Sequence, residues 1–401
     1  MIVDHFRIIQ SICRIGIGSD NPAFRHQVDR LIGALEKHGA DREANVLRQM
    51  LTVEHEQQKL KPSRVVTSSA RDFGEILSVR TLPPVDRETG APLAEIHHPT
   101  EADLISPIFV PRLEQAVQNL IAEWANFDRL AEIGVPPART CLFFGLPGTG
   151  KTRLAYFIAA KLQLPIITAR LDGLISSFLG TTARNLGNLF DFANRYRCLL
   201  LLDEFDAVAK LRDDPQEIGE IKRVVNTLLQ NIDARSDRGL TIAITNHEKL
   251  LDKAVWRRFE TRISIPPPGP AERAAILERY LPPLESNVQW VTFLSWLTEG
   301  MTGSELQTFV HGMKRNAAIH GNARSLIENV QAIAMTSANL APSPRMALLF
   351  GGFQKLAIEA LKDPQAGITQ AGLAAVFQKD QTTISRWLRS DAAEEALAYG
   401  K

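Results

Sequence analysis

The chain contains few cysteines and no long apolar run, and both shortages exclude classes of protein. Every apolar stretch is shorter than the roughly 18 residues that cross a bilayer, so no membrane span is expected. Charged residues interrupt the first 16 positions, MIVDHFRIIQSICRIG, which therefore lack the apolar centre of a signal peptide. Three widely separated cysteines indicate buried reduced thiols rather than a disulfide framework or a zinc site: Cys13, Cys141 and Cys198. The sequence predicts a cytoplasmic protein with no membrane partner.

A surplus of charge of one sign is also missing. The 46 Lys and Arg residues nearly balance the 45 Asp and Glu residues, which gives a formal net charge of +1. Since there is no global basic field, any nucleic-acid binding must come from a local patch. No H-E-x-x-H motif occurs, so the chain has no zinc-protease site of that type. His97 and His98 have no Cys or carboxylate at ligand spacing, and we expect no metal role for them.

The apolar pattern divides the chain into regions of different character. Between positions 106 and 268, apolar runs typical of strands alternate with helical stretches: TCLFFG, LPIITAR, CLLLLDEFD, LTIAITN and RISIP. Continuous apolar strands separated by helices indicate an α/β fold, in which a parallel sheet carries helices on both faces. The predicted regions are a helical domain at 1–60, a proline-rich linker at 61–105, the α/β domain at 106–268, a helical domain at 269–340 and a C-terminal helical region at 341–401.

A phosphate-binding loop follows the first of these strands. The stretch GLPGTGKT, residues 145–152, fits the pattern G-x-x-x-x-G-K-[ST] and lies between a predicted strand and a predicted helix. Its glycines let backbone N–H groups turn toward phosphate, and the helix N-terminus favours anions. We expect Lys151 to reach the β- and γ-phosphates and the Thr152 hydroxyl to hold Mg²⁺. The predicted nucleotide-binding residues here are Pro147, Gly148, Thr149, Gly150, Lys151, Thr152 and Arg153.

Two adjacent carboxylates end the strand CLLLLDEFD. A strand this apolar has no structural need for Asp203 and Glu204 at its end, although a solvated strand end is the alternative interpretation. Beside a phosphate-binding loop, Asp203 is predicted to complete the Mg²⁺ site and Glu204 to orient and activate the attacking water. The pattern therefore predicts a nucleotide-hydrolysing enzyme.

Over about residues 106–340 the chain resembles the AAA+ ATPases, and among them the AAA family proper. LTIAITNHE matches a strand that ends in a polar sensor, and EGMTGSELQ matches the helix start of the family's small lid domain. LDKAVWRRFETRISIPPP is similar to the second region of homology, in the RRFE form of the clade that includes katanin-like and ESCRT-disassembling ATPases. The resemblance implies a P-loop NTPase sheet sandwiched by helices, a helical lid at 269–340, and ATP and Mg²⁺ as cofactors.

The resemblance also implies contacts to the nucleotide. Asn246, with Thr245 beside it, would contact the γ-phosphate or the attacking water. Gly303 and Ser304 occupy the place where other AAA+ branches carry a sensor arginine, and they join the ATP-binding set. For the adenine, the segments 106–110 and 133–134 are candidates by position alone.

Two arginines in the RRFE stretch correspond to the family's arginine fingers. By the resemblance, Arg257 and Arg258 complete the nucleotide site of a neighbouring subunit, and a pair of solvated surface arginines is the alternative. A finger supplied in trans means that the active site is complete only between subunits. The resemblance therefore implies a homo-oligomer, expected to be a hexameric ring.

The stretch LISSFLGTT places large apolar side chains in a predicted loop. In the families that this chain resembles, the loop after the second strand lines a central pore, and Phe178, Leu179 and Gly180 fall in register with it. Such side chains would grip an extended polypeptide whatever its sequence; a loop tip folded into a core is the alternative. A second pore loop, or simply a solvated turn, is predicted at 210–216.

The C-terminal segment 365–392 resembles a helix-turn-helix. Thr369 is the expected cap of its first helix, and Gln378 stands where glycine usually permits the turn. If the segment binds DNA, the residues expected in the major groove are Gln381, Thr382, Thr383, Ser385 and Arg386. A small helical domain that contacts protein is the alternative.

These features favour an ATP-dependent AAA protein remodeller or unfoldase that forms a ring and threads a protein substrate through its pore. A separate protease or an adaptor remains open as a partner. The alternative is a DNA-associated AAA+ ATPase, such as a loader or a transposition helper, that uses the C-terminal helices. A third and weaker interpretation is a nucleotide switch that hydrolyses ATP slowly.

Overall fold

The computed structural model contains two compact units, Met1–Arg71 and Asp72–Lys401. The structure describes residues 28, 30–32, 34–35, 40, 44–47, 75–171, 179–207, 218–235, 239–284, 287–321, 325–336, 343 and 345–399. In the first unit, the described residues other than Ala40 are helical, and five apolar side chains form a buried cluster: Val28, Ile32, Leu35, Ala44 and Leu47. This helical character agrees with the apolar spacing of that stretch.

A six-stranded sheet is the centre of the second unit, with the strand order β1-β3-β4-β5-β2-β6. All the pairings are parallel except that of β1 with β3. The strands are β1 (Glu95–His97), β2 (Thr140–Phe144), β3 (Ile166–Arg170), β4 (Leu199–Asp203), β5 (Thr241–Thr245) and β6 (Thr261–Ser264). The five apolar runs of the sequence therefore form β2 to β6, and the predicted α/β fold is confirmed.

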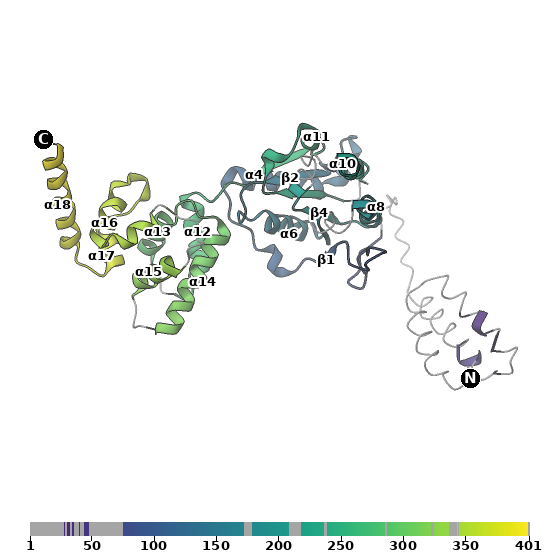
Figure 1. The fold of residues 1–401 in the computed structure, drawn as a ribbon, viewed down its shortest axis with the longest axis horizontal. Helices are drawn as coiled ribbons and strands as arrows, with labels where there is room; N and C mark the ends of the chain where they lie inside the picture. The colour runs from purple at the N-terminus through teal and green to yellow at the C-terminus, as the bar shows by residue number, and fades with distance from the viewer. Residues whose placement is uncertain are drawn as a thin grey trace. The chain divides into compact units, whose positions relative to one another are not determined.

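Helices cover both faces of the sheet, as Figure 1 shows. Successive residues of β4 point to opposite faces: Leu200 and Leu202 pack with α8 and α10, whereas Leu199 and Leu201 pack with α4 and α6. Because both faces are buried, the strands are predominantly apolar along their whole length. These helices are α4 (Pro111–Ala125), α6 (Lys151–Leu162), α8 (Leu179–Arg195) and α10 (Ile218–Asp233).

The edge strand β1 lies within the stretch that the sequence predicted to be a linker. Ile96 pairs with Ile167 of β3, and the preceding Leu93 and Ala94 are buried in the core of the sheet. Asn185 of α8 donates a hydrogen bond to the carboxylate of Asp86, which also accepts backbone N–H groups from its own turn. Part of the predicted linker is thus fixed against the α/β domain.

A helical bundle follows β6 and continues to the C-terminus (Figure 1). Its members are α12 (Pro270–Tyr280), α13 (Val288–Leu297), α14 (Gly303–His320), α15 (Leu326–Thr336), α16 (Phe353–Lys362), α17 (Gln370–Phe377) and α18 (Gln381–Tyr399). One continuous hydrophobic core contains side chains from all of them. The Phe377 ring of α17 lies 5.8 Å from that of Phe293 in α13 and 5.1 Å from that of Phe353 in α16. The C-terminal helices α16 to α18 therefore share one core with α12 to α15.

Short elements complete the described chain. They are α5 (Phe127–Glu132), α11 (Lys253–Trp256) and the 3₁₀ turns η2 (Glu101–Leu104), η3 (Glu248–Leu250), η5 (Met346–Phe350) and η6 (Pro364–Ala366). None of the helices within the described ranges has the length and apolar character needed to cross a bilayer.

Candidate active site

The phosphate-binding loop connects β2 to the N-terminus of α6, as the sequence predicts. Gly145, Gly148 and Gly150 have φ angles of 146°, 77° and 98°, which side chains other than glycine rarely adopt. A Cβ atom on Gly148 would also lie 2.1 Å from the Ser304 hydroxyl oxygen. Glycine is therefore needed at this position both for the backbone turn and for the close approach of the lid.

Lys151 is a buried cation at the first position of α6, and its side chain turns back onto the loop. Its Nζ donates hydrogen bonds to the carbonyl oxygens of Gly145 (2.8 Å) and Leu146 (2.7 Å). An ammonium group has three donors, so one N–H remains for a phosphate oxygen. Burial lowers the pKa of Lys151 to about 8, against the opposing effect of the nearby Asp203, Glu248 and Asp206 carboxylates.

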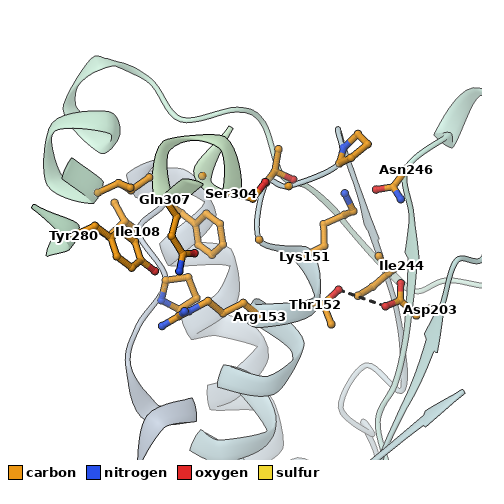
Figure 2. A pocket seen from close by; sticks show the side chains of 18 of the residues that line it. Ile108, Lys151, Thr152, Arg153, Asp203, Ile244, Asn246, Tyr280, Ser304 and Gln307 are labelled. Atoms are coloured by element: carbon orange, nitrogen blue, oxygen red, sulfur yellow. Dashed lines mark hydrogen bonds between the residues drawn. The ribbon is translucent and has the colours of Figure 1, made fainter. Parts of the chain in front are cut away.

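Thr152 and Asp203 bring two oxygen atoms together where β4 ends beside α6. The Thr152 hydroxyl donates to Asp203 Oδ2 at 3.4 Å (Figure 2). Magnesium prefers hard oxygen ligands and usually takes one or two from protein and the rest from phosphate and water. A hydroxyl and a carboxylate next to a phosphate-binding loop fit that requirement, so these two residues would hold the ion.

Glu204 leaves the strand in an unusual backbone conformation. Its φ of 54° lies in the left-handed region, a strain of about 1–3 kcal/mol for a residue other than glycine. The Glu204 N–H donates to Asp203 Oδ1 at 2.9 Å, and the Glu204 carboxylate lies 3.4 Å from the Arg170 guanidinium. Glu204 lines the same cavity as Lys151, so the geometry places a carboxylate within the phosphate region.

Asn246 and Thr245 take different positions after β5. Asn246 lines the cavity opposite the phosphate-binding loop, as Figure 2 shows. Thr245 is fully buried, and its hydroxyl accepts the His247 N–H (3.0 Å) and donates to Asp206 (3.5 Å). Asn246 can therefore contact a nucleotide bound in the cavity, whereas Thr245 is buried and hydrogen-bonds to neighbouring protein groups.

Residues of the helical bundle line one side of the cavity. Helix α14 begins with a capping box, in which Thr302 and Glu305 satisfy each other's backbone N–H groups. The Ser304 N–H then donates to the Gly148 carbonyl oxygen at 3.1 Å. Gly303 and Ser304 both line the cavity, as do all seven residues proposed from the loop and helix start.

The cavity has a volume of about 440 Å³, within the range of small-molecule sites. Its far end contains side chains that the sequence reasoning missed: Ile276, Arg279 and Tyr280 of α12 and Gln307 of α14. Figure 2 shows Tyr280, Ile108 and Gln307 grouped at this end, away from Asn246 and Asp203. Of the two segments proposed for adenine by position, 106–110 supplies Pro107, Ile108 and Phe109, and 133–134 does not line the cavity.

The two arginines of the RRFE stretch lie outside this cavity. Arg257 caps the end of α11, and both side chains are exposed. Arg258 forms an ion pair with Asp233 at 2.9 Å. Neither is among the residues that line the nucleotide cavity of its own chain.

The remaining predicted residues lie elsewhere. Phe178 and the segment 210–216 are outside the described residues, and Leu179 and Gly180 begin α8. The five proposed DNA-contacting residues lie in the first two turns of α18 and do not line the nucleotide cavity.

Comparisons with known proteins agree with this geometry. Residues 141–267 match the family described as "ATPase family associated with various cellular activities (AAA)". An uncharacterized AAA family ATPase, y4kL, of Sinorhizobium fredii is 43% identical over 162 residues, which are 40% of this chain and 48% of that protein. Proteasome-activating nucleotidase 2 of Haloferax volcanii is 37% identical over 160 residues, 38% of this chain and 39% of that protein. The chain thus spans less than half the length of these relatives.

A solved structure with the same fold is the FIGL-1 AAA domain in complex with ADP. The TM-score is 0.50, the sequence identity is 19%, and the likeness covers 65% of this chain and 93% of that domain. At this identity the comparison supports the fold alone.

Proposed function

The chain carries the ATPase domain of the AAA family, and from this premise we propose that it is an ATP-dependent protein remodeller or unfoldase of the cytoplasm. Copies of the chain assemble into a ring, and ATP hydrolysis draws a polypeptide through the central pore. The proposed ATP hydrolysis rests on one observation: five residues predicted to act in it line a single cavity of about 440 Å³, namely Lys151, Thr152, Asp203, Glu204 and Asn246.

Each of these residues has a distinct role in hydrolysis. Lys151 binds the β- and γ-phosphates through its remaining N–H donor. Thr152 and Asp203 hold Mg²⁺, which neutralises phosphate charge when bound. Glu204 orients the attacking water and accepts its proton, and Asn246 hydrogen-bonds to the γ-phosphate or to that water.

The proposal of a ring is supported by the two arginines of the RRFE stretch. Arg257 and Arg258 directly follow α11, are exposed, and do not line the cavity of their own chain. Arginines in such a position serve as fingers for a neighbouring copy, where they stabilise the charge of the transition state. The complete site then forms only between subunits, and we expect a hexamer.

The protein substrate is supported by the pore-loop stretch and by a relative. Phe178, Leu179 and Gly180 come after the second apolar strand run of the sequence, at the pore-loop register of the family. One relative is named as a proteasome-activating nucleotidase, which makes a separate protease or an adaptor a reasonable partner for this chain as well.

A single substitution tests the hydrolytic assignment. Because Glu204 acts as the general base, Glu204→Gln should still bind ATP and assemble, while the steady-state ATPase rate falls about 10²-fold or more. Glu359→Gln, which removes an exposed carboxylate from α16, is the matched control and should retain the rate. Turnover by Glu204→Gln at the control's rate would refute the role of Glu204.

The alternative function is a DNA-associated ATPase that uses the C-terminal helices. The polar exposed face of α18 favours it, and the two functions are compatible if DNA only positions the remodeller. Duplex DNA rather than unfolded protein would then stimulate the ATPase.

A further inference from the structure

The last helices have a geometry that the ATPase function does not use. Helix α17 ends at Gln378, whose φ of 54° gives the left-handed turn that glycine usually makes. The Lys379 N–H donates to the Ala374 carbonyl oxygen at 2.9 Å, and only three residues separate α17 from α18. Two helices joined by a turn this short form a helix-turn-helix.

One side of α18 anchors it to the bundle. Ile384 is fully buried against α17 and α16, and Trp387 packs partly into the same core. Further along, Ser390 accepts a hydrogen bond from the Gln354 side chain of α16 at 3.1 Å. These contacts fix which side of the helix remains open.

Over residues 381–390, the part of α18 whose side chains the structure describes, the open side is polar or basic. At about 100° per residue, Gln381, Thr382, Ser385, Arg386 and Arg389 fall within an arc of about 140°, and all are exposed or partly exposed. Thr383 lies outside that arc. A helix that docks into a protein groove would carry apolar anchors on its exposed side, and the described part of this face has none.

The charge of the turn and the open face is complementary to a polyanion. Within residues 379–390, whose side chains are described, three exposed basic residues, Lys379, Arg386 and Arg389, stand against one exposed acidic residue, Asp380, which leaves a charge of +2 in this stretch. The acidic residues Asp391, Glu394 and Glu395 follow further along the helix. This patch is notable because the whole chain has a net charge of only +1. Arginine and glutamine are also the residues that pair bidentately with guanine and adenine in the major groove, and Ser or Thr can contact either.

We propose that the exposed face of α18 binds double-stranded DNA by entering the major groove. Gln381, Thr382, Ser385 and Arg386 contact base edges or phosphates, and Arg389 and Lys379 contact phosphates. This activity is separate from the proposed remodelling of proteins, because it requires neither ATP turnover nor the pore loop.

The test measures binding of the full chain to a fluorescently labelled 30-base-pair DNA duplex by fluorescence anisotropy, without nucleotide, at 50 and 200 mM salt. The wild type should bind at 50 mM salt and weaken markedly at 200 mM. Arg386→Ala should weaken DNA binding by about fivefold or more. It should also reduce the slope of the log binding constant against log salt concentration by about 1, the loss expected for one phosphate contact.

A matched control separates this face from general basic charge. Arg315→Ala removes an exposed arginine from α14 and should leave DNA affinity unchanged, and both variants should melt at the wild-type temperature. Absence of wild-type binding at 50 mM salt would overturn the proposal. An equal loss of DNA affinity in Arg386→Ala and Arg315→Ala would also overturn the proposal. So would displacement of the duplex by an unfolded polypeptide at comparable concentration.

Discussion

Among single residues, Lys151 has the most strongly altered acid–base chemistry of the nucleotide site. Burial lowers its pKa from 10.5 to about 8, although three carboxylates nearby oppose this shift. The folded state therefore releases the proton at lower pH than the unfolded state does. By linkage, this group makes the free energy of unfolding rise with pH between about 8 and 10.5.

The same pKa predicts a pH dependence of nucleotide binding. As pH rises through about 8, the free site loses its ammonium charge, and ADP must then bind together with a proton. We expect the Kd for ADP, measured by calorimetry, to increase by up to about tenfold per pH unit above pH 8.

Lys151→Arg is the control for this dependence, because arginine stays charged throughout the range. Its ADP affinity should change little between pH 7.5 and 9.5. A wild-type affinity that is equally flat would show that Lys151 keeps its proton in the free site.

At the scale of elements, the sequence predicts the elements that neighbouring residues encode. It does not predict the pairings and cavity residues that only tertiary packing brings together. The strands β2 to β6 and the phosphate-binding loop are encoded in continuous apolar runs and in one short motif, so both could be predicted. Strand β1 has only three residues, too few for an apolar pattern, and pairs with a strand about 70 positions away. Tyr280 and Gln307 reach the cavity only because α12 and α14 pack beside it, and no local signal marks them.

The packing of α17 bears on the predicted division of the helical region between residues 340 and 341. Between α15 and α16 the sequence ANLAPSPR resembles a linker, yet Phe377 inserts between Phe293 and Phe353 and joins the helices on both sides of it. Spatial contacts of this kind leave no trace in local composition.

This shared core predicts a large effect of truncating Phe377. Phe377→Ala should reduce the free energy of unfolding of the helical bundle by about 3–5 kcal/mol in a denaturant titration followed by tryptophan fluorescence. The exposed control Lys355→Ala on α16 should stay within about 0.5 kcal/mol of the wild type. If α16 to α18 unfold in a separate early transition while the lid keeps its stability, the C-terminal helices are an independent domain.

At the scale of the whole molecule, the proposal depends on copies that complete one another's sites. The Arg257→Ala/Arg258→Ala variant keeps an intact cavity but lacks fingers, whereas Glu204→Gln keeps the fingers but lacks the base. Each variant alone should hydrolyse ATP slowly. When they are mixed, Glu204→Gln subunits should supply fingers to intact cavities, so the ATPase rate should exceed the sum of the separate rates.

The mixing experiment has a clear opposite outcome. A rate equal to the sum of the two separate rates, with mixed assemblies confirmed by size-exclusion chromatography, would show that the arginines do not act between subunits. Arg258 would then have a structural role through its ion pair with Asp233.

The central claim is that ATP hydrolysis is coupled to a polypeptide gripped by the pore loop. The most direct test is the steady-state ATPase rate of the wild type, Phe178→Ala and Phe178→Tyr, each alone, with an unfolded polypeptide such as casein, and with duplex DNA. We predict that unfolded polypeptide stimulates the wild type and Phe178→Tyr, which keeps the aromatic area, and fails to stimulate Phe178→Ala. Stimulation by DNA alone, equal in all three proteins, would contradict the claim.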